Sequence, residues 1–163
     1  MAEKTVVVRH EGGMRFVTRS GSNHEFVMDD ARGDTGMRPT EAVLAGLTAC
    51  TAMDVVSIMQ KKRQVYDSYV VHTRGEQRAE YPQIYTRIDI VHEVVGPDVD
   101  VAQVRRSIEL SATKYCPVSA MLSAGDTEIH HRYRVRRTGD QPLEEEGEVI
   151  VTGPYQRPDV IRS

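Results

Sequence analysis

The sequence of 163 residues contains no tryptophan, two phenylalanines and two cysteines. With so few large aromatic rings, the core must rest on valine, isoleucine, leucine, methionine and tyrosine. The length allows one domain with a substantial core. The cysteines, Cys50 and Cys116, are too few for the disulfide framework of a small secreted domain. We therefore interpret them as free thiols, metal ligands or a redox pair.

Several signatures of function are also missing. The net charge of -3 gives no basic excess for binding nucleic acid. The N-terminus lacks the apolar segment of a signal peptide, which predicts a cytoplasmic protein. The uncharged run 42–53 is shorter than the roughly 20 residues that span a bilayer, so we expect no membrane partner. No nucleophile elbow and no phosphate-binding loop is present.

The sequence also offers no pattern of metal ligands. It has no C-x-x-C pair, and its six histidines show no ligand spacing. His130 and His131 are neighbours on an expected strand and therefore point to opposite faces of a sheet. We predict neither a metal site nor a cofactor.

A long apolar segment from Arg38 to Arg63 is the most prominent feature that the sequence does have. Pro39 suits the first turn of a helix, and the cations at 61–63 suit the last turn. Between them, apolar residues fall on nearly every face, with small residues around Cys50. A helix that is apolar all round is buried all round. We therefore predict a central buried helix that keeps Cys50 away from bulk water.

Predicted strands lie on both sides of this helix in the sequence. The three strands before it form a meander with turns at Gly12–Gly13 and at 20–23. After it, Cys116–Pro117 separates two further helices, because proline disfavours helical geometry in the residue before it. Strands grouped before and after helices indicate the α+β class. The expected strands are 4–9, 14–19, 24–28, 68–78, 84–95 and 127–137, and the expected later helices are 100–114 and 117–124.

Residues 138–163 differ in composition from residues 1–137, which we interpret as the folded domain. The acidic run 144–148 predicts a solvated linker, and residues 149–151 are able to add an edge strand. The prolines from Pro154 onward favour an extended tail. We therefore predict a C-terminal extension beyond the domain.

Two segments resemble the cysteine motifs of one protein family. Residues 38–56 (RPTEAVLAGLTACTAMDVV) resemble the first motif of the OsmC/Ohr family of osmotically inducible and organic hydroperoxide resistance proteins. Residues 110–119 (LSATKYCPVS) resemble the second motif, and both forms are most similar to the YhfA-like branch. The resemblance covers about residues 4–137. It implies the OsmC-like fold and an intertwined homodimer with active sites at the subunit interface.

The resemblance also implies a chemistry for the two thiols, the reduction of organic hydroperoxides. Cys50 would attack the peroxide and become a sulfenic acid, and Cys116 would resolve this acid to a disulfide. An external dithiol, in the family a lipoyl protein, would then reduce the disulfide. The apolar helix would favour hydrophobic peroxides over hydrogen peroxide.

The family keeps its attacking thiol ionised with an arginine that a glutamate holds. In family peroxidases this glutamate directly follows the proline, whereas here Thr40 does and Glu41 comes one residue later. Nine helical residues at about 100° each put Glu41 on the opposite side of the helix from Cys50. Glu41 therefore either caps the helix or acts across the dimer. The candidate arginines are Arg32 and Arg38, which flank the loop entering the helix, with Arg15 as a more distant alternative.

Two other functions fit the same residues. The first is a dimeric binding protein for a small apolar ligand. In that case both thiols are ordinary core residues, since free cysteine is among the most buried residue types. The second is a thiol redox sensor, in which Cys50 is oxidised without catalytic turnover.

Overall fold

The computed structural model describes residues 3–153, and its contacts divide the chain into two compact units, residues 1–45 and residues 46–163. The strands of the first unit are β1 (Val6–His10), β2 (Phe16–Ser20) and β3 (Glu25–Met28). They form an antiparallel sheet in the order β1-β2-β3. The predicted meander is therefore confirmed.

The loop after β3 is ordered by one buried carboxylate, that of Asp29. It accepts hydrogen bonds from the Asp30 backbone N–H at 2.8 Å and from the Thr35 hydroxyl at 2.6 Å. A Cβ at position 33 would collide with this carboxylate, which explains the glycine there. The loop that leads into the long helix consequently has a defined course.

The long predicted helix is present as α1 (Pro39–Lys61). Proline stands at its first helical position, and the side chain of Glu41 accepts a hydrogen bond from the backbone N–H of Arg38 at 2.8 Å. This contact is half of a capping box, in which a glutamate in the first turn satisfies the N-cap amide. The basic residue in the last turn, Lys61, suits the negative end of the helix.

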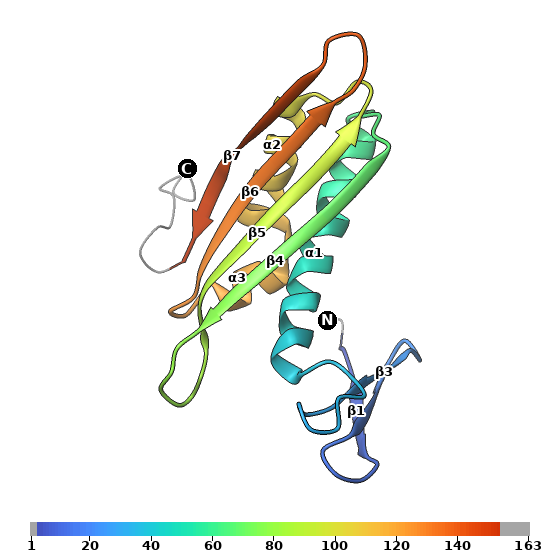
Figure 1. Ribbon diagram of the computed structural model, residues 1–163, viewed down its shortest axis with the longest axis vertical. Coiled ribbons are helices and arrows are strands. Elements are labelled where there is room, and N and C mark those ends of the chain that lie inside the picture. Colours follow the sequence, from blue (N-terminus) through green and yellow to red (C-terminus); the bar gives the residue numbers. More distant parts are fainter. Residues whose placement is uncertain (1–2, 154–163) are drawn as a thin grey trace. The chain divides into compact units, whose positions relative to one another are not determined.

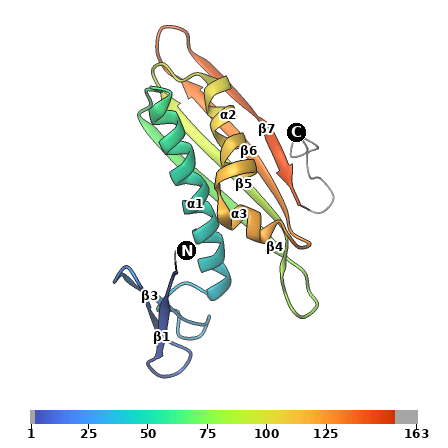
Figure 2. The ribbon, with the colours of Figure 1, turned by 180° about the vertical axis from the view of Figure 1, so that it is seen from behind.

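The second unit is built on a four-stranded sheet. Its strands are β4 (Ser68–Gln77), β5 (Tyr85–Gly96), β6 (Glu128–Arg137) and β7 (Leu143–Thr152), in the order β4-β5-β6-β7. Strands β5 and β6 are parallel, whereas the other pairs are antiparallel. A parallel pair needs a long crossover, and here the crossover is helical. The helices cover one face of this sheet (Figures 1 and 2).

The crossover contains three consecutive pieces: α2 (Val101–Leu110), the π-helical turn η1 (Ser111–Tyr115) and α3 (Pro117–Leu122). Asp100 caps α2 by accepting hydrogen bonds from the backbone N–H groups of residues 102 and 103. Cys116 has extended backbone angles and serves as the N-cap of α3. The predicted interruption at Cys116 is therefore confirmed, and the predicted helix 100–114 ends as a π-helical turn.

The inner face of the sheet forms the core together with α1 and α2. Residues that alternate along β5 and β6 are almost completely buried, as the period of two predicts. Two of these inward residues, His92 and His131, are histidines with no exposed surface. The inward residues are Ile88, Ile90, His92 and Val94 of β5, and Ile129, His131, Tyr133 and Val135 of β6.

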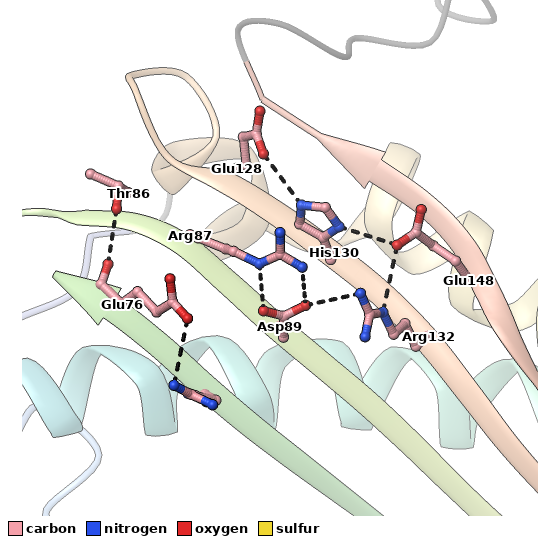
Figure 3. Close-up of polar contacts among 9 residues, drawn as sticks. Glu76, Thr86, Arg87, Asp89, Glu128, His130, Arg132 and Glu148 are labelled. Atoms are coloured by element: carbon pink, nitrogen blue, oxygen red, sulfur yellow. Dashed lines mark hydrogen bonds and ion pairs between the residues drawn. The ribbon is translucent and has the colours of Figure 1, made fainter.

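The outer face of the same sheet carries ion pairs instead (Figure 3). Asp89 on β5 accepts from Arg87 at 2.7 Å and lies 3.4 Å from Arg132 on β6. His130, on the face opposite His131, lies 3.1 Å from Glu148 on β7. This face is charged, which is the usual arrangement for a sheet covered by helices on one side only.

The structure corrects the prediction for residues 138–148. The acidic run expected to be a linker belongs to β7, which pairs with β6 over residues 143–152. The physical reason is its partner strand: Arg134 lies 3.2 Å from Glu146, and the Tyr133 hydroxyl donates to Glu145 at 2.6 Å. The domain boundary predicted at residue 137 therefore falls between two paired strands. The predicted tail from Pro154 lies outside the described residues.

Helix α1 is buried along one stripe only, not on every face as the sequence predicts. Leu47, Thr51, Val55 and Met59 are buried, whereas Met53 is 74% exposed. The helix is also longer than its uncharged run, and by length and composition alone it qualifies as a membrane span. Core helices of soluble proteins pass the same test, so its length decides nothing about a membrane.

Candidate functional site

The two cysteines lie side by side in the second unit. The sulfur of Cys50, in the middle of α1, is 3.0 Å from the sulfur of Cys116, at the start of α3. Both are free thiols; Cys116 is almost completely buried and Cys50 is half-buried. The backbone N–H of Ser119 points to the Cys116 sulfur at 3.4 Å. Two thiols 66 residues apart in the chain therefore share one site.

A carboxylate completes this cluster. Asp54 follows Cys50 by one helical turn, and its oxygen accepts a hydrogen bond from the Ser111 hydroxyl at 2.9 Å. The Ser111 hydroxyl is in turn 3.0 Å from the hydroxyl of Thr51. The ligand atoms of Asp54 and the two cysteines all lie within 4.8 Å of one another. We predicted no metal site from sequence spacing, yet these three groups have the types and the proximity that a metal ion requires.

The surroundings of Cys50 disfavour its thiolate. Burial raises its pKa to about 11, and the hydrogen bond with Cys116 and the negative charge of Asp54 act in the same direction. A backbone hydrogen bond from Val118 acts against them. The groups that shift this pKa in the described chain belong to the second unit and include no cation. At neutral pH Cys50 is therefore a protonated thiol unless a positive charge is supplied.

The predicted arginines belong to the first unit, where the structure shows local partners. Arg38 donates to the Asp34 carboxylate and to the Gly36 carbonyl, each at 2.8 Å. The hydrogen bond with Asp34 raises the pKa of Arg38, so this side chain is a permanent cation. The backbone N–H of Arg32 donates to Asp30 at 3.0 Å, and its residue is exposed. Glu41 caps α1, which is one of the two roles that the sequence left open for it.

The first unit also contains an apolar pocket of about 490 Å³. Side chains from the three strands of this sheet, from the turn between β1 and β2 and from the segment after β3 line it, and Arg38 is among them. The apolar residues among them are Val8, Met14, Phe16, Met28, Ala31 and Pro39. Such a volume, with few polar groups, is typical of a site for a small apolar ligand.

Sequence reasoning missed Asp54, Ser111 and Thr51. A signal for Asp54 was available, because it is the only charge in α1 between Glu41 and Lys61 and stands four residues after Cys50. A charge inside an apolar stretch of helix needs a partner. No local pattern identifies Ser111 as that partner, since it lies 57 residues away in the chain.

The fold and the paired thiols define a family. Residues 32–142 match the family described as OsmC-like protein, and the chain belongs to it. The predicted α+β fold and the predicted resemblance are thus confirmed.

Individual relatives agree with this assignment. Protein YhfA of Escherichia coli K12 is 41% identical over 123 residues, which are 76% of this chain and 91% of YhfA. A hypothetical protein of Aquifex aeolicus has a solved structure that is 27% identical, with a TM-score of 0.75 over 85% of this chain and 99% of that one. The organic hydroperoxide resistance protein OhrB of Bacillus subtilis is 17% identical, with a TM-score of 0.56 over 81% and 98% of the chains. This last likeness concerns the fold alone.

Proposed function

We propose that this protein reduces organic hydroperoxides with two cysteines. The observation that carries the proposal is the 3.0 Å separation of the Cys50 and Cys116 sulfurs. Membership in a family whose structural relatives include hydroperoxide resistance proteins supports it. Cys50 is the proposed attacking thiol, since it is the more accessible of the two.

The reaction proceeds in three balanced steps. The Cys50 thiolate attacks the outer peroxide oxygen, the O–O bond breaks, and the alkoxide takes a proton and leaves as an alcohol, with a sulfenic acid on Cys50. Cys116 then attacks the Cys50 sulfur, which expels water and forms a disulfide. An external dithiol reduces this disulfide by exchange and is itself oxidised. For the second step the sulfurs must approach from 3.0 Å to about 2.05 Å.

The first step requires a cation near Cys50. Because burial and Asp54 raise the pKa of this thiol, we propose that Arg38 or Arg32 of one protomer supplies the charge. We also propose a homodimer, supported by the exposed apolar side chains of a single chain. Val7 is 67% exposed and Met53 is 74% exposed, and large apolar side chains exposed on a single chain are typical of interfaces when they form a patch.

The test is peroxide consumption by the full-length, reduced protein. Cumene hydroperoxide and linoleic acid hydroperoxide are supplied with dihydrolipoamide, and peroxide loss is followed with time. We expect turnover by the native protein, none by Cys50→Ser, and at most one equivalent consumed by Cys116→Ser. Ser57→Ala, an exposed change on the same helix, serves as the matched control and should retain full activity. Absence of turnover with several peroxides and dithiols would reject the proposal.

A second candidate function is the binding of a small apolar ligand, which the pocket in the first unit favours. Native mass spectrometry distinguishes the two. A ligand that stays bound in the double variant Cys50→Ser, Cys116→Ser supports binding without catalysis. Rapid oxidation of Cys50 to a sulfenic acid without recycling would instead support the redox sensor.

A further inference from the structure

We propose that Cys50, Asp54 and Cys116 of the reduced protein bind one zinc ion. Their ligand atoms already lie within 4.8 Å of one another. Two thiolates and a carboxylate are donors that zinc accepts, and three protein ligands with a water in the fourth position form a common open zinc site. The proposal does not depend on the peroxidase function, because binding needs only these three side chains.

The backbone already places the ligands on converging elements. Cys50 and Asp54 are four residues apart on α1 and therefore lie on one side of the helix. Cys116 approaches from the start of α3, which puts its sulfur 3.0 Å from that of Cys50. In a tetrahedral site with zinc–sulfur bonds of about 2.3 Å, the sulfurs are about 3.8 Å apart. Binding therefore needs the two sulfurs to separate by less than 1 Å.

Hydrogen bonds around the ligands support the same conclusion. The Ser111 hydroxyl donates to one oxygen of Asp54 at 2.9 Å, and the Thr51 hydroxyl lies 3.0 Å from that of Ser111. The Ser119 backbone N–H is directed at the Cys116 sulfur. Ligands of metal sites are commonly oriented by such outer hydrogen bonds. In this cluster the carboxylate has a fixed orientation beside the two sulfurs.

Charge also favours a cation here. The carboxylate of Asp54 is half-buried and lies beside two thiols, and it accepts a hydrogen bond from the neutral Ser111 hydroxyl. A divalent ion would offset the negative charge of the cluster. It would also compete with the Cys50–Cys116 disulfide, since the oxidised sulfurs are no longer thiolates.

Metal titration of the reduced, chelator-treated full-length protein tests the proposal. We expect one Zn²⁺ per chain, measured by competition with a chromophoric chelator. We also expect Co²⁺ to produce thiolate-to-cobalt charge-transfer absorption that Zn²⁺ abolishes. Asp54→Asn should weaken Zn²⁺ binding at least tenfold, whereas Asp126→Asn, the same change at an exposed turn, should leave it unchanged.

Other outcomes would overturn the site. Absence of the charge-transfer band, or a band that persists in Cys50→Ser, removes the thiol ligands from the proposal. Equal Zn²⁺ affinity in Asp54→Asn and in the native protein removes the carboxylate. Circular dichroism of each variant establishes that it is folded, and Ser111→Ala, which keeps all three ligands, should weaken binding less than Asp54→Asn does.

Discussion

The two units of the chain differ in what they bury. Among the described residues, the buried apolar side chains all lie in the second unit, between Leu47 and Val151. Among the described residues of the first unit, only Thr18 and Asp29 are buried, and both are polar. A three-stranded sheet without an apolar core is not stable alone. We infer that the second unit supplies the stability, and that the first supplies charges and an apolar surface.

The largest expected effect tests where the stability lies. Ile90→Ala, at a fully buried position, should lower the free energy of unfolding by about 2–5 kcal/mol. Val7→Ala, at a position 67% exposed in the single chain, should change the free energy of unfolding by no more than about 0.5 kcal/mol at protein concentrations where the chain is monomeric. Denaturant unfolding measures both values. A large loss for Val7→Ala would show that a partner covers the first unit.

The next effect tests whether the first unit supplies the charge. One of the substitutions Arg38→Ala and Arg32→Ala should slow alkylation of Cys50 by iodoacetamide at pH 7 about tenfold or more. The reason is that loss of the nearby cation raises the pKa of the Cys50 thiol, and a rise of about one pH unit lowers the thiolate fraction about tenfold. Arg9→Ala is the matched control, because Arg9 lies in the same unit and pairs with Glu11 at 2.9 Å. Equal rates in all three variants would contradict a role for the first unit.

A smaller effect concerns the core of the second unit. Burial lowers the pKa of His92 to about 3 and that of His131 to about 4, so both are neutral in the fold. The unfolded chain binds protons more readily, with a histidine pKa of about 6.5. The stability that these two neutral histidines contribute is therefore fully present above pH 6.5 and is lost as the pH falls toward 4.

The histidine prediction can be measured with one substitution. When the pH falls from 6.5 to 5.5, the free energy of unfolding should decrease by about 1 kcal/mol less in His131→Leu than in the native protein. His72→Leu, at an exposed position, should leave the slope unchanged. Thermal unfolding across this pH range gives the comparison, and parallel curves for both variants would contradict it.

The smallest effect concerns Asp54. Its negative charge is the last of the causes that raise the pKa of Cys50, so Asp54→Asn should lower that pKa. At pH 7 to 8 the alkylation of Cys50 should become faster by up to about fivefold, which corresponds to roughly 1 kcal/mol of repulsion. Unchanged or slower alkylation, with Asp126→Asn as control, would contradict this assignment.

Local signals in the sequence predicted most of the fold. Pro39 and the cations at 61–63 bound α1 closely, and the strand predicted at 127–137 agrees with β6. Of strand β7, only residues 149–151 were predicted as a possible edge strand, because the glutamate run before them has low strand propensity. Its stability comes from pairing with the arginine-rich β6, a partner that no local pattern names.

The site was less predictable than the fold. The pairing of Cys50 with Cys116 followed only from the resemblance to the OsmC/Ohr family, because no spacing joins residues 66 positions apart. Asp54 was overlooked since a single charge in a helix is usually exposed. The roles of Arg32, Arg38 and Glu41 in catalysis stay predictions, and for Glu41 the structure shows a helix cap.

The adjacent thiols also connect the redox state to heat resistance. A bond between the two sulfurs would close a covalent ring from Cys50 to Cys116 that includes strands β4 and β5 of the large sheet. In the chain-entropy account, such a ring restricts the denatured ensemble and stabilises the fold by about 4 kcal/mol. The oxidised form should therefore melt at a higher temperature than the reduced form. The melting temperature measured by calorimetry would then indicate whether a sample carries the disulfide.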